Sequence, residues 1–247
     1  MPIPSRPVCR RIAIGLFTLC FLHPVRAAPD PQTGRIDEMP MYGGLERFQQ
    51  ARIADPALKA ADEKLIVDAS AHWGSREQAA RAWIEQGYAF YGQNQLGMAM
   101  RRFNQAWLLD PSNSQVYAGF AAVLHDQDRV CEAMTMMDKA LSLSPPNNQG
   151  MLADAARIVT LCAVSNTGLS VQDRNALYKR SQDLYVQAEK VEPNKGYVYY
   201  SWATANYWQG NYDGAWQMVA KARSHGMEPN SQFMRMLTAK MPAPQAR

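Results

Sequence analysis

A repeat with a period of 34 residues constrains this chain more than any other feature of its sequence. In the first copy, large and small residues follow one another at fixed spacings and end in a proline: Trp83, Gly87, Ala99, Phe103, Ala106 and Pro111. Thirty-four residues later the same sizes return in the same order: Tyr117, Ala121, Ala133, Met137, Ala140 and Pro145. Such a period indicates a chain built from stacked copies of one small structural unit.

The repeat continues past the second copy with one interruption. Pro193 comes 48 residues after Pro145, so the third copy holds 14 more residues than the period allows. We expect this insertion between the two helices of the third copy, at about 164–174, where Ser-Asn-Thr-Gly is typical of a loop. The register then returns, because Ser181, Tyr185 and Ala188 recur 34 residues later as Ala215, Val219 and Ala222.

Each copy is predicted to form two antiparallel α-helices. In the first copy, Ser75 with Gln78 three residues later is typical of a capped helix start, and apolar or small residues then recur with helical spacing. Gly92 opens the turn to the second helix, which ends before Pro111 because proline cannot continue a helix interior. One pair cannot bury its apolar face alone, so the copies must stack.

These residues resemble the tetratricopeptide repeat family over about 75–230. The family pattern is Trp, Leu-Gly, Tyr, Ala, Phe, Ala and Pro, and the first copy matches it with Trp83, Gln86-Gly87, Phe90, Ala99, Phe103, Ala106 and Pro111. Gln86 departs from the usual Leu, and the third copy is degenerate. The resemblance implies an all-α, right-handed α-solenoid of about four helix-turn-helix repeats, at 75–113, 114–147, 148–195 with the insertion, and 196–230.

Two further helices are expected to flank the array. Asp55 and Pro56 open an amphipathic N-terminal helix over 55–74, with Asp55 as its cap. Residues 231–247 are predicted to form a capping helix and tail, which such arrays need for solubility. Residues 28–54 contain several prolines and a pair of glycines, and we interpret them as a flexible linker.

The first 27 residues have the layout of a secretory signal peptide. A basic start ends at Arg10-Arg11, an apolar run extends from Ile12 to Leu22, and Ala27 and Ala28 supply small residues for cleavage. This run is too short to span a bilayer, and no later apolar run approaches the length required. We therefore expect a periplasmic or secreted protein with no stable membrane span.

The distribution of charge argues against a nucleic-acid partner. The whole chain has 26 basic and 22 acidic residues and a formal net charge of +4. However, residues 1–27 contain four arginines and no acidic residue, so the remainder holds 22 of each sign. Without a basic surface, the electrostatic basis for nucleic-acid binding is missing.

Two cysteines outside the leader form a candidate disulfide. Cys131 is expected at the start of the second helix of the second copy, and Cys162 near the end of the first helix of the third copy. Antiparallel neighbours place these two ends side by side, and an exported protein meets oxidising conditions. The alternative is a pair of buried free thiols.

The sequence predicts no catalytic residues, no metal site and no cofactor. His72, His125 and His225 have no partners at metal-ligand spacing. No nucleophile elbow, phosphate-binding glycine loop or metalloprotease motif occurs. The cluster Met134–Met137 could suggest a soft metal, but Met137 holds a core position of the repeat, which favours packing.

Function is expected on the concave groove, which in this family is lined by the first helix of each pair. At 100° per residue, one set of mostly aromatic residues falls opposite the packing positions. This candidate partner-binding set is Arg81, Tyr88, Tyr91, His125, Tyr197, Tyr200, Tyr207 and Trp208. Exposed aromatic patches tend to mark partner sites. The alternative is that residues 28–54 or the helix at 55–74 cover these rings.

One known activity of the family is not expected. Its best-known peptide site clamps a terminal carboxylate with Lys and Asn, whereas Ile84 and Tyr88 stand at the matching positions here. The favoured function is an exported scaffold for a protein or extended peptide, acting as an adaptor, assembly factor or chaperone of the bacterial cell envelope. The alternatives are an immunity or inhibitory protein against a secreted toxin, and an enzyme with an unrecognised site in 164–174. The fold alone cannot choose among them.

Overall fold

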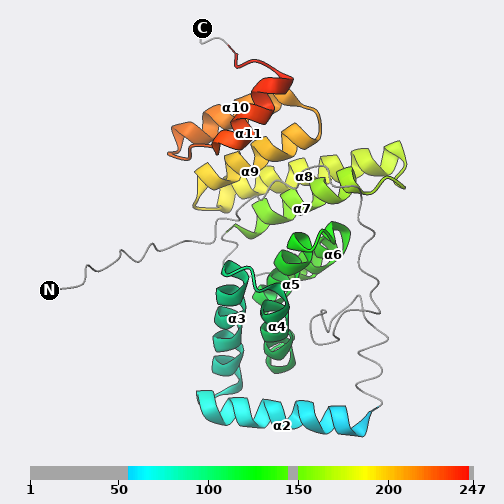
Figure 1. Cartoon of the computed structure of the whole chain (residues 1–247), viewed down its shortest axis with the longest axis vertical. Coiled ribbons are helices and arrows are strands. Elements are labelled where there is room, and N and C mark those ends of the chain that lie inside the picture. The colour runs from blue at the N-terminus through cyan, green and yellow to red at the C-terminus, as the bar shows by residue number, and fades with distance from the viewer. Residues whose placement is uncertain (1–54, 144–149, 245–247) are drawn as a thin grey trace, which may run out of the picture.

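The computed structural model describes residues 55–143 and 150–244, and within these ranges the chain is entirely helical (Figure 1). The prediction of an all-α protein is confirmed, because the described residues form ten α-helices and no strand. The helices are α2 (Pro56–Trp73), α3 (Arg76–Gly92), α4 (Leu96–Leu109), α5 (Ser114–Asp126), α6 (Val130–Ser142), α7 (Met151–Ser165), α8 (Val171–Val191), α9 (Lys195–Trp208), α10 (Tyr212–Ser224) and α11 (Ser231–Lys240). The predicted signal peptide at 1–27 and linker at 28–54 lie outside the described residues. None of the described helices combines the length and the apolar character that a membrane span requires.

Eight of these helices form four consecutive hairpins: α3–α4, α5–α6, α7–α8 and α9–α10. Three of the hairpins are closed by only three residues, and the α7–α8 hairpin is closed by five, Asn166–Ser170. Figure 1 shows the hairpins following one another along the long axis of the molecule, with α2 crossing one end and α11 covering the other. The chain therefore has a repeat-like helical architecture.

Side-chain caps explain where several of these helices begin. The Asp55 carboxylate accepts hydrogen bonds from the backbone N–H groups of Ala57 (2.8 Å) and Leu58 (3.3 Å). Ser75 Oγ accepts one from the N–H of Gln78 at 3.1 Å. The asparagines that follow the repeat prolines act in the same way, and their side chains cap α5, α9 and α11: Asn113, Asn194 and Asn230. Each of these asparagines thus starts the next helix directly after a proline-containing turn.

Phe103 of α4 is the centre of the larger hydrophobic core. Its side chain is fully buried, and its ring lies directly against Gly87 of α3 and Gly119 of α5. A Cβ atom built on Gly87 would lie 2.6 Å from the ring, and one on Gly119 would lie 2.4 Å from it. Both glycines are needed because any side chain would occupy the space of the phenylalanine.

Replacing Gly119 with alanine should therefore destabilise the protein although alanine is the better helix former. Because Phe103 has no solvent to move into, we expect the overpacked core to lower the free energy of unfolding by about 1–3 kcal/mol in urea titrations. Gly92→Ala is the matched control, since nothing lies within 4 Å of its added Cβ. That variant should be neutral or more stable by up to about 1 kcal/mol. Equal effects of the two variants would contradict this account of the core.

The insertion in the third copy differs from the expected loop at 164–174. Only Asn166–Ser170 lie outside helices there, and most of the extra residues lengthen α8 to 21 residues, against 13 or 14 in α4, α6 and α10. Ser170 caps the lengthened helix, because its Oγ accepts a hydrogen bond from the N–H of Asp173 at 3.1 Å. The Ser-Asn-Thr-Gly sequence predicted the position of the turn correctly, but it did not predict that the turn is only five residues long.

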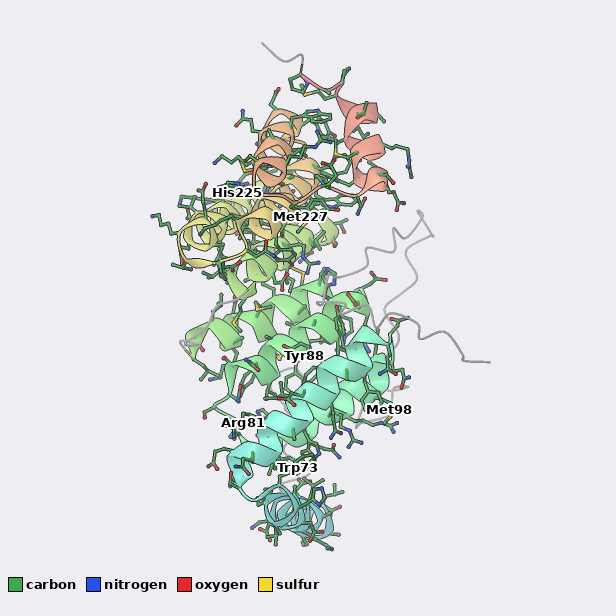
Figure 2. The ribbon with its side chains drawn as sticks, turned by 90° about the vertical axis from the view of Figure 1, so that its left-hand side faces the viewer. Trp73, Arg81, Tyr88, Met98, His225 and Met227 are labelled. Atoms are coloured by element: carbon green, nitrogen blue, oxygen red, sulfur yellow. A yellow bond between two sulfur atoms is a disulfide. The ribbon has the colours of Figure 1, made fainter. Side chains whose placement is uncertain are left out.

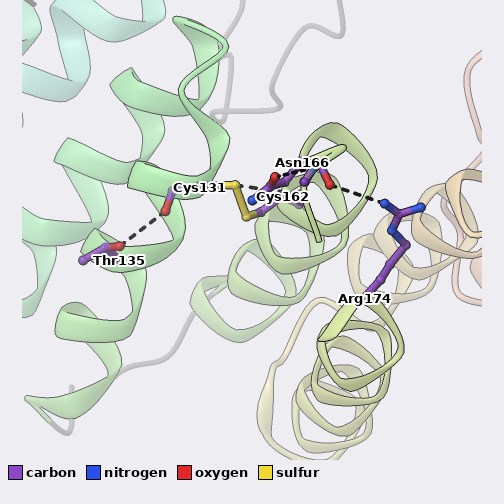
Figure 3. Close-up of a disulfide and its surroundings, with 6 residues drawn as sticks. Cys131, Thr135, Cys162, Asn166 and Arg174 are labelled. Atoms are coloured by element: carbon purple, nitrogen blue, oxygen red, sulfur yellow. Dashed lines mark hydrogen bonds between the residues drawn. A yellow bond between two sulfur atoms is a disulfide. The ribbon is translucent and has the colours of Figure 1, made fainter. Parts of the chain in front are cut away.

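A disulfide joins two neighbouring hairpins. Cys131 near the start of α6 is bonded to Cys162 near the end of α7, and their Cα atoms are 4.8 Å apart (Figure 3). Cys162 is almost completely buried, whereas Cys131 is half-buried. The bond ties the second hairpin to the third next to the α7–α8 turn.

Removing this bond is expected to lower the free energy of unfolding by about 3 kcal/mol, because the unfolded chain loses a closed loop of about 31 residues. The Cys131→Ser/Cys162→Ser double variant can be compared with the wild-type protein in urea, with and without reductant. The reductant should lower the free energy of unfolding of the wild-type protein and leave that of the double variant unchanged. Two free thiols per chain in denatured, unreduced protein would contradict the bond.

Candidate partner-binding face

The eight predicted groove residues come from the first helix of three hairpins, α3, α5 and α9. We call the solvent-facing side of α3, α5, α7 and α9 the first-helix face. Arg81 is exposed near the α2 end of α3, and Tyr88 lies closer to the middle of the molecule (Figure 2). Trp208 is 37% exposed, and the other predicted residues on this face are half-buried: Tyr91, His125, Tyr197, Tyr200 and Tyr207. Ile84, which the sequence analysis placed on the same side, is buried and belongs to the core.

The middle of the first-helix face holds a histidine between an acid and an arginine. His125 Nδ1 lies 2.7 Å from Asp126 Oδ1, and Arg157 Nη1 of α7 lies 3.1 Å from His125 Nε2. Because a guanidinium can only donate, His125 Nε2 must accept, and the ring proton must then reside on Nδ1 and point to Asp126. These contacts fix the orientation of the imidazole ring between Asp126 and Arg157.

Arg157 also links this histidine to α9. Its Nη2 donates to Asp154 Oδ1 at 3.2 Å, and the Tyr197 hydroxyl donates to the same carboxylate oxygen. Burial raises the pKa of Tyr197 well above its ordinary value, and the charge of Asp154 raises it further. Burial lowers the pKa of Arg157, but Tyr197 and Asp154 raise it by more, so the guanidinium stays charged.

Two tyrosines of α3 extend the same network toward the first hairpin. Burial raises the pKa of Tyr91, which also hydrogen-bonds the Asp126 carboxylate. Burial raises the pKa of Asp126, but its hydrogen bonds to His125 and Tyr91 lower it by more, leaving it below its ordinary value. The Tyr88 hydroxyl donates to the backbone carbonyl of Gln115 at 3.3 Å. One polar network thus connects α3, α5, α7 and α9 and fixes its side chains before any partner arrives.

The aromatic end of the face is partly covered by α11 of the same chain. The Phe233 ring of α11 lies 5.8 Å from the Tyr200 ring and 5.9 Å from the Tyr207 ring, centre to centre. Asn230 Nδ2 donates to the Tyr200 hydroxyl at 2.7 Å. Residues 28–54 or the helix at 55–74 are the alternative cover expected from the sequence for these rings. The structure shows partial cover by the capping helix, and α2 lies at the opposite end of the molecule (Figure 1), while residues 28–54 lie outside the described residues.

A small apolar slot remains between α9 and α11. It has a volume of about 20 Å³ and is lined by Tyr200, Thr204, Tyr207, Trp208, Asn230, Phe233 and Met236. A space of this size holds about one methyl group or one water molecule, and the apolar lining favours the methyl group. Trp208, whose ring packs edge-on against Tyr207 at 5.3 Å, is the exposed aromatic ring of the lining.

Sequence reasoning missed Asp126, Asp154 and Arg157. Asp154 and Arg157 lie one helical turn apart in α7, where almost every other residue is apolar. Two charged residues one turn apart on an otherwise apolar helix indicate which side of α7 is exposed, and this pattern could have identified them. The degenerate third copy hid it, because the repeat pattern gave no reliable positions there.

The first-helix face offers hydrogen bonding and aromatic contact. The described residues contain no group of three or more His, Cys, Asp or Glu that could hold a metal ion. In the α7–α8 turn, Asn166 accepts hydrogen bonds from Gly168 N (3.1 Å) and Arg174 (3.4 Å), so its polar groups serve the local turn. Comparison of the sequence with protein-family models and with curated proteins finds no match.

Proposed function

We propose that this chain is an exported scaffold of the tetratricopeptide repeat type, a right-handed solenoid of four helix pairs that binds a peptide or protein segment along its first-helix face. The 34-residue period, the four consecutive hairpins and the signal-like leader support this proposal. We infer that it acts as an adaptor, assembly factor or chaperone with no chemistry of its own.

The observation that carries the proposal is the slot at the aromatic end of the face. Trp208 stands 37% exposed at an opening lined by rigid rings, and Tyr197 in the first turn of the same helix belongs to the hydrogen-bonded network of Arg157 and Asp154. Rigid aromatic side chains bury a large area at low entropic cost, which is why they recur at binding hot spots. A partner would place one small apolar side chain in the slot and extend over the polar network.

Trp208→Ala should weaken the partner while leaving the fold intact. Loss of a hot-spot tryptophan costs about 1–3 kcal/mol of binding free energy, or about 5- to 150-fold in affinity. The partner can be captured from an envelope extract on the immobilised protein, identified by mass spectrometry, and its affinity measured for both variants. A captured toxin would instead assign the immunity function.

The control is Trp202→Ala, six residues earlier in α9. Trp202 stacks on Tyr185 at 5.3 Å and donates to Gln182 at 2.6 Å, so its loss should lower the free energy of unfolding by about 2–3 kcal/mol. Trp208→Ala should leave the melting temperature nearly unchanged. If both variants lowered it equally, Trp208 would serve the fold, and the binding role of this face would be wrong.

A further inference from the structure

Another open feature of the described residues is a cleft between α2 and the first hairpin, at the opposite end of the molecule from the slot between α9 and α11 (Figure 1). It has a volume of about 550 Å³. α2 crosses the end of α3 and α4 nearly at right angles, so part of the helix extends beyond the hairpin (Figure 1). Only Ala69 of α2 is fully buried. The helix therefore reaches past the surface that supports it.

The wall of the cleft is apolar and its rim carries charge. Ala61, Leu65 and Trp73 of α2 face Trp83 of α3 across it. Trp73 is 38% exposed, and it lies where α2 meets α3 (Figure 2). Leu58, one turn before Ala61 on the same stripe of α2, is 36% exposed. An apolar stripe of this kind on a helix normally packs against another segment when the protein is in water.

Charged side chains of α2 and α4 stand on the rim of the cleft. Lys64 and Arg102 stand on opposite sides of the cleft, and Lys64 is paired with Asp68 at 2.6 Å.

The chain itself brings apolar residues to this place. Residues 28–54 run directly into Asp55, the cap of α2, so they are tethered to the helix that forms one wall of the cleft. Leu45, Phe48 and Ile53 lie within the ten residues before Asp55, together with one acidic residue, Glu46, and two arginines, Arg47 and Arg52. We propose that the stretch 45–54 occupies this cleft and that Leu45 and Phe48 pack against the α2 stripe and the two tryptophans.

Stretch 45–54 is long enough to reach the cleft from Asp55. From Pro56 to Trp73, α2 rises about 26 Å, which an extended chain covers in about 8 residues. The ten residues of stretch 45–54 can therefore run back along most of α2, and the whole stretch 28–54 is longer than this requires. A short tether also gives a local concentration in the millimolar range, so even a weak contact would be occupied. The occupied cleft would complete the N-terminal end of the array, as α11 covers the other end.

Hydrogen exchange of α2 tests this proposal in the purified protein. The variant L45D/F48D should lose at least about tenfold protection in residues 61–73, because exposing the stripe makes local opening of α2 easier. The control Q49D/Q50D introduces the same two charges into the same segment and should retain protection. Exchange in α5 should be unchanged in both variants.

Two results would overturn the proposal. Equal protection of α2 in the wild type and in L45D/F48D would show that stretch 45–54 does not cover the cleft. Protection that falls on dilution of the wild type would assign the cleft to a second copy of the chain. Protection that is independent of concentration and lost only in L45D/F48D supports the tethered stretch.

Discussion

Phe103→Ala is expected to lower the free energy of unfolding by about 3–5 kcal/mol, the range for deleting a large buried aromatic ring. Phe103 has no exposed surface, and its ring lies edge-on to Tyr88 at 5.1 Å and to Phe120 at 6.4 Å. These contacts join α3, α4 and α5, so the first two hairpins share this one side chain. Urea unfolding followed by circular dichroism measures the loss.

Phe90→Ala removes the same atoms from the same hairpin and provides the control. Phe90 is only half-buried, with the Arg102 guanidinium 5.9 Å from its ring centre. Its removal should lower the free energy of unfolding by about 1–2 kcal/mol, because less apolar surface is buried at this position and no closed cavity forms. If Phe90→Ala were as damaging as Phe103→Ala, the central position assigned to Phe103 would be wrong.

The sequence predicted the packing within each hairpin better than the packing between hairpins. Gly87 and Phe103 belong to the same copy, and the repeat pattern identified both as packing positions. Gly119 contacts the same ring but lies in the next copy, two residues before the small position that the pattern assigns to Ala121. A contact between copies depends on the angle at which hairpins stack, which a repeat period alone does not encode.

The candidate site was predicted in part for the same reason. Helical projection placed Tyr88, His125 and Tyr197 on exposed faces of their own helices, but the projection of single helices does not show which side chains meet. Arg157 joins His125 to Asp154 across two hairpins, and the position of α7 relative to α5 creates that link. The cover of Tyr200 by α11 likewise depends on where the last helix turns back.

Glu192 is a buried carboxyl group that the repeat pattern does not explain. It directly follows α8, is 1% exposed, and its Oε1 accepts a hydrogen bond from the N–H of Ala153 in the first turn of α7 at 2.9 Å. The side chain thereby caps the start of one helix of the third hairpin from the end of the other. Burial raises the pKa of Glu192 from 4.5 to about 7, although the amide of Ala153 lowers it.

The stability of the protein should therefore decrease with rising pH. A carboxyl whose pKa is higher in the folded state binds its proton more tightly there, so its contribution is complete below about pH 4.5 and is lost as the pH rises through about 7. A shift of this size corresponds to about 3 kcal/mol. Urea unfolding at pH 5, 7 and 9 should show this loss in the wild type.

Glu192→Gln should remove most of this pH dependence, because the amide keeps an acceptor for Ala153 N without acquiring a charge. Glu189→Gln, three residues earlier in α8, is the matched control. Hydrogen bonds from Tyr199 and Lys221 lower the pKa of Glu189, so its contribution is lost only on acidification and does not fall between pH 5 and 9. A Glu192→Gln variant that lost as much stability as the wild type between pH 5 and 9 would exclude Glu192 as the source. In that case another group would cause the loss of stability between pH 5 and 9. Ionisation of the Glu192 carboxyl in the wild type would then not lower the free energy of unfolding.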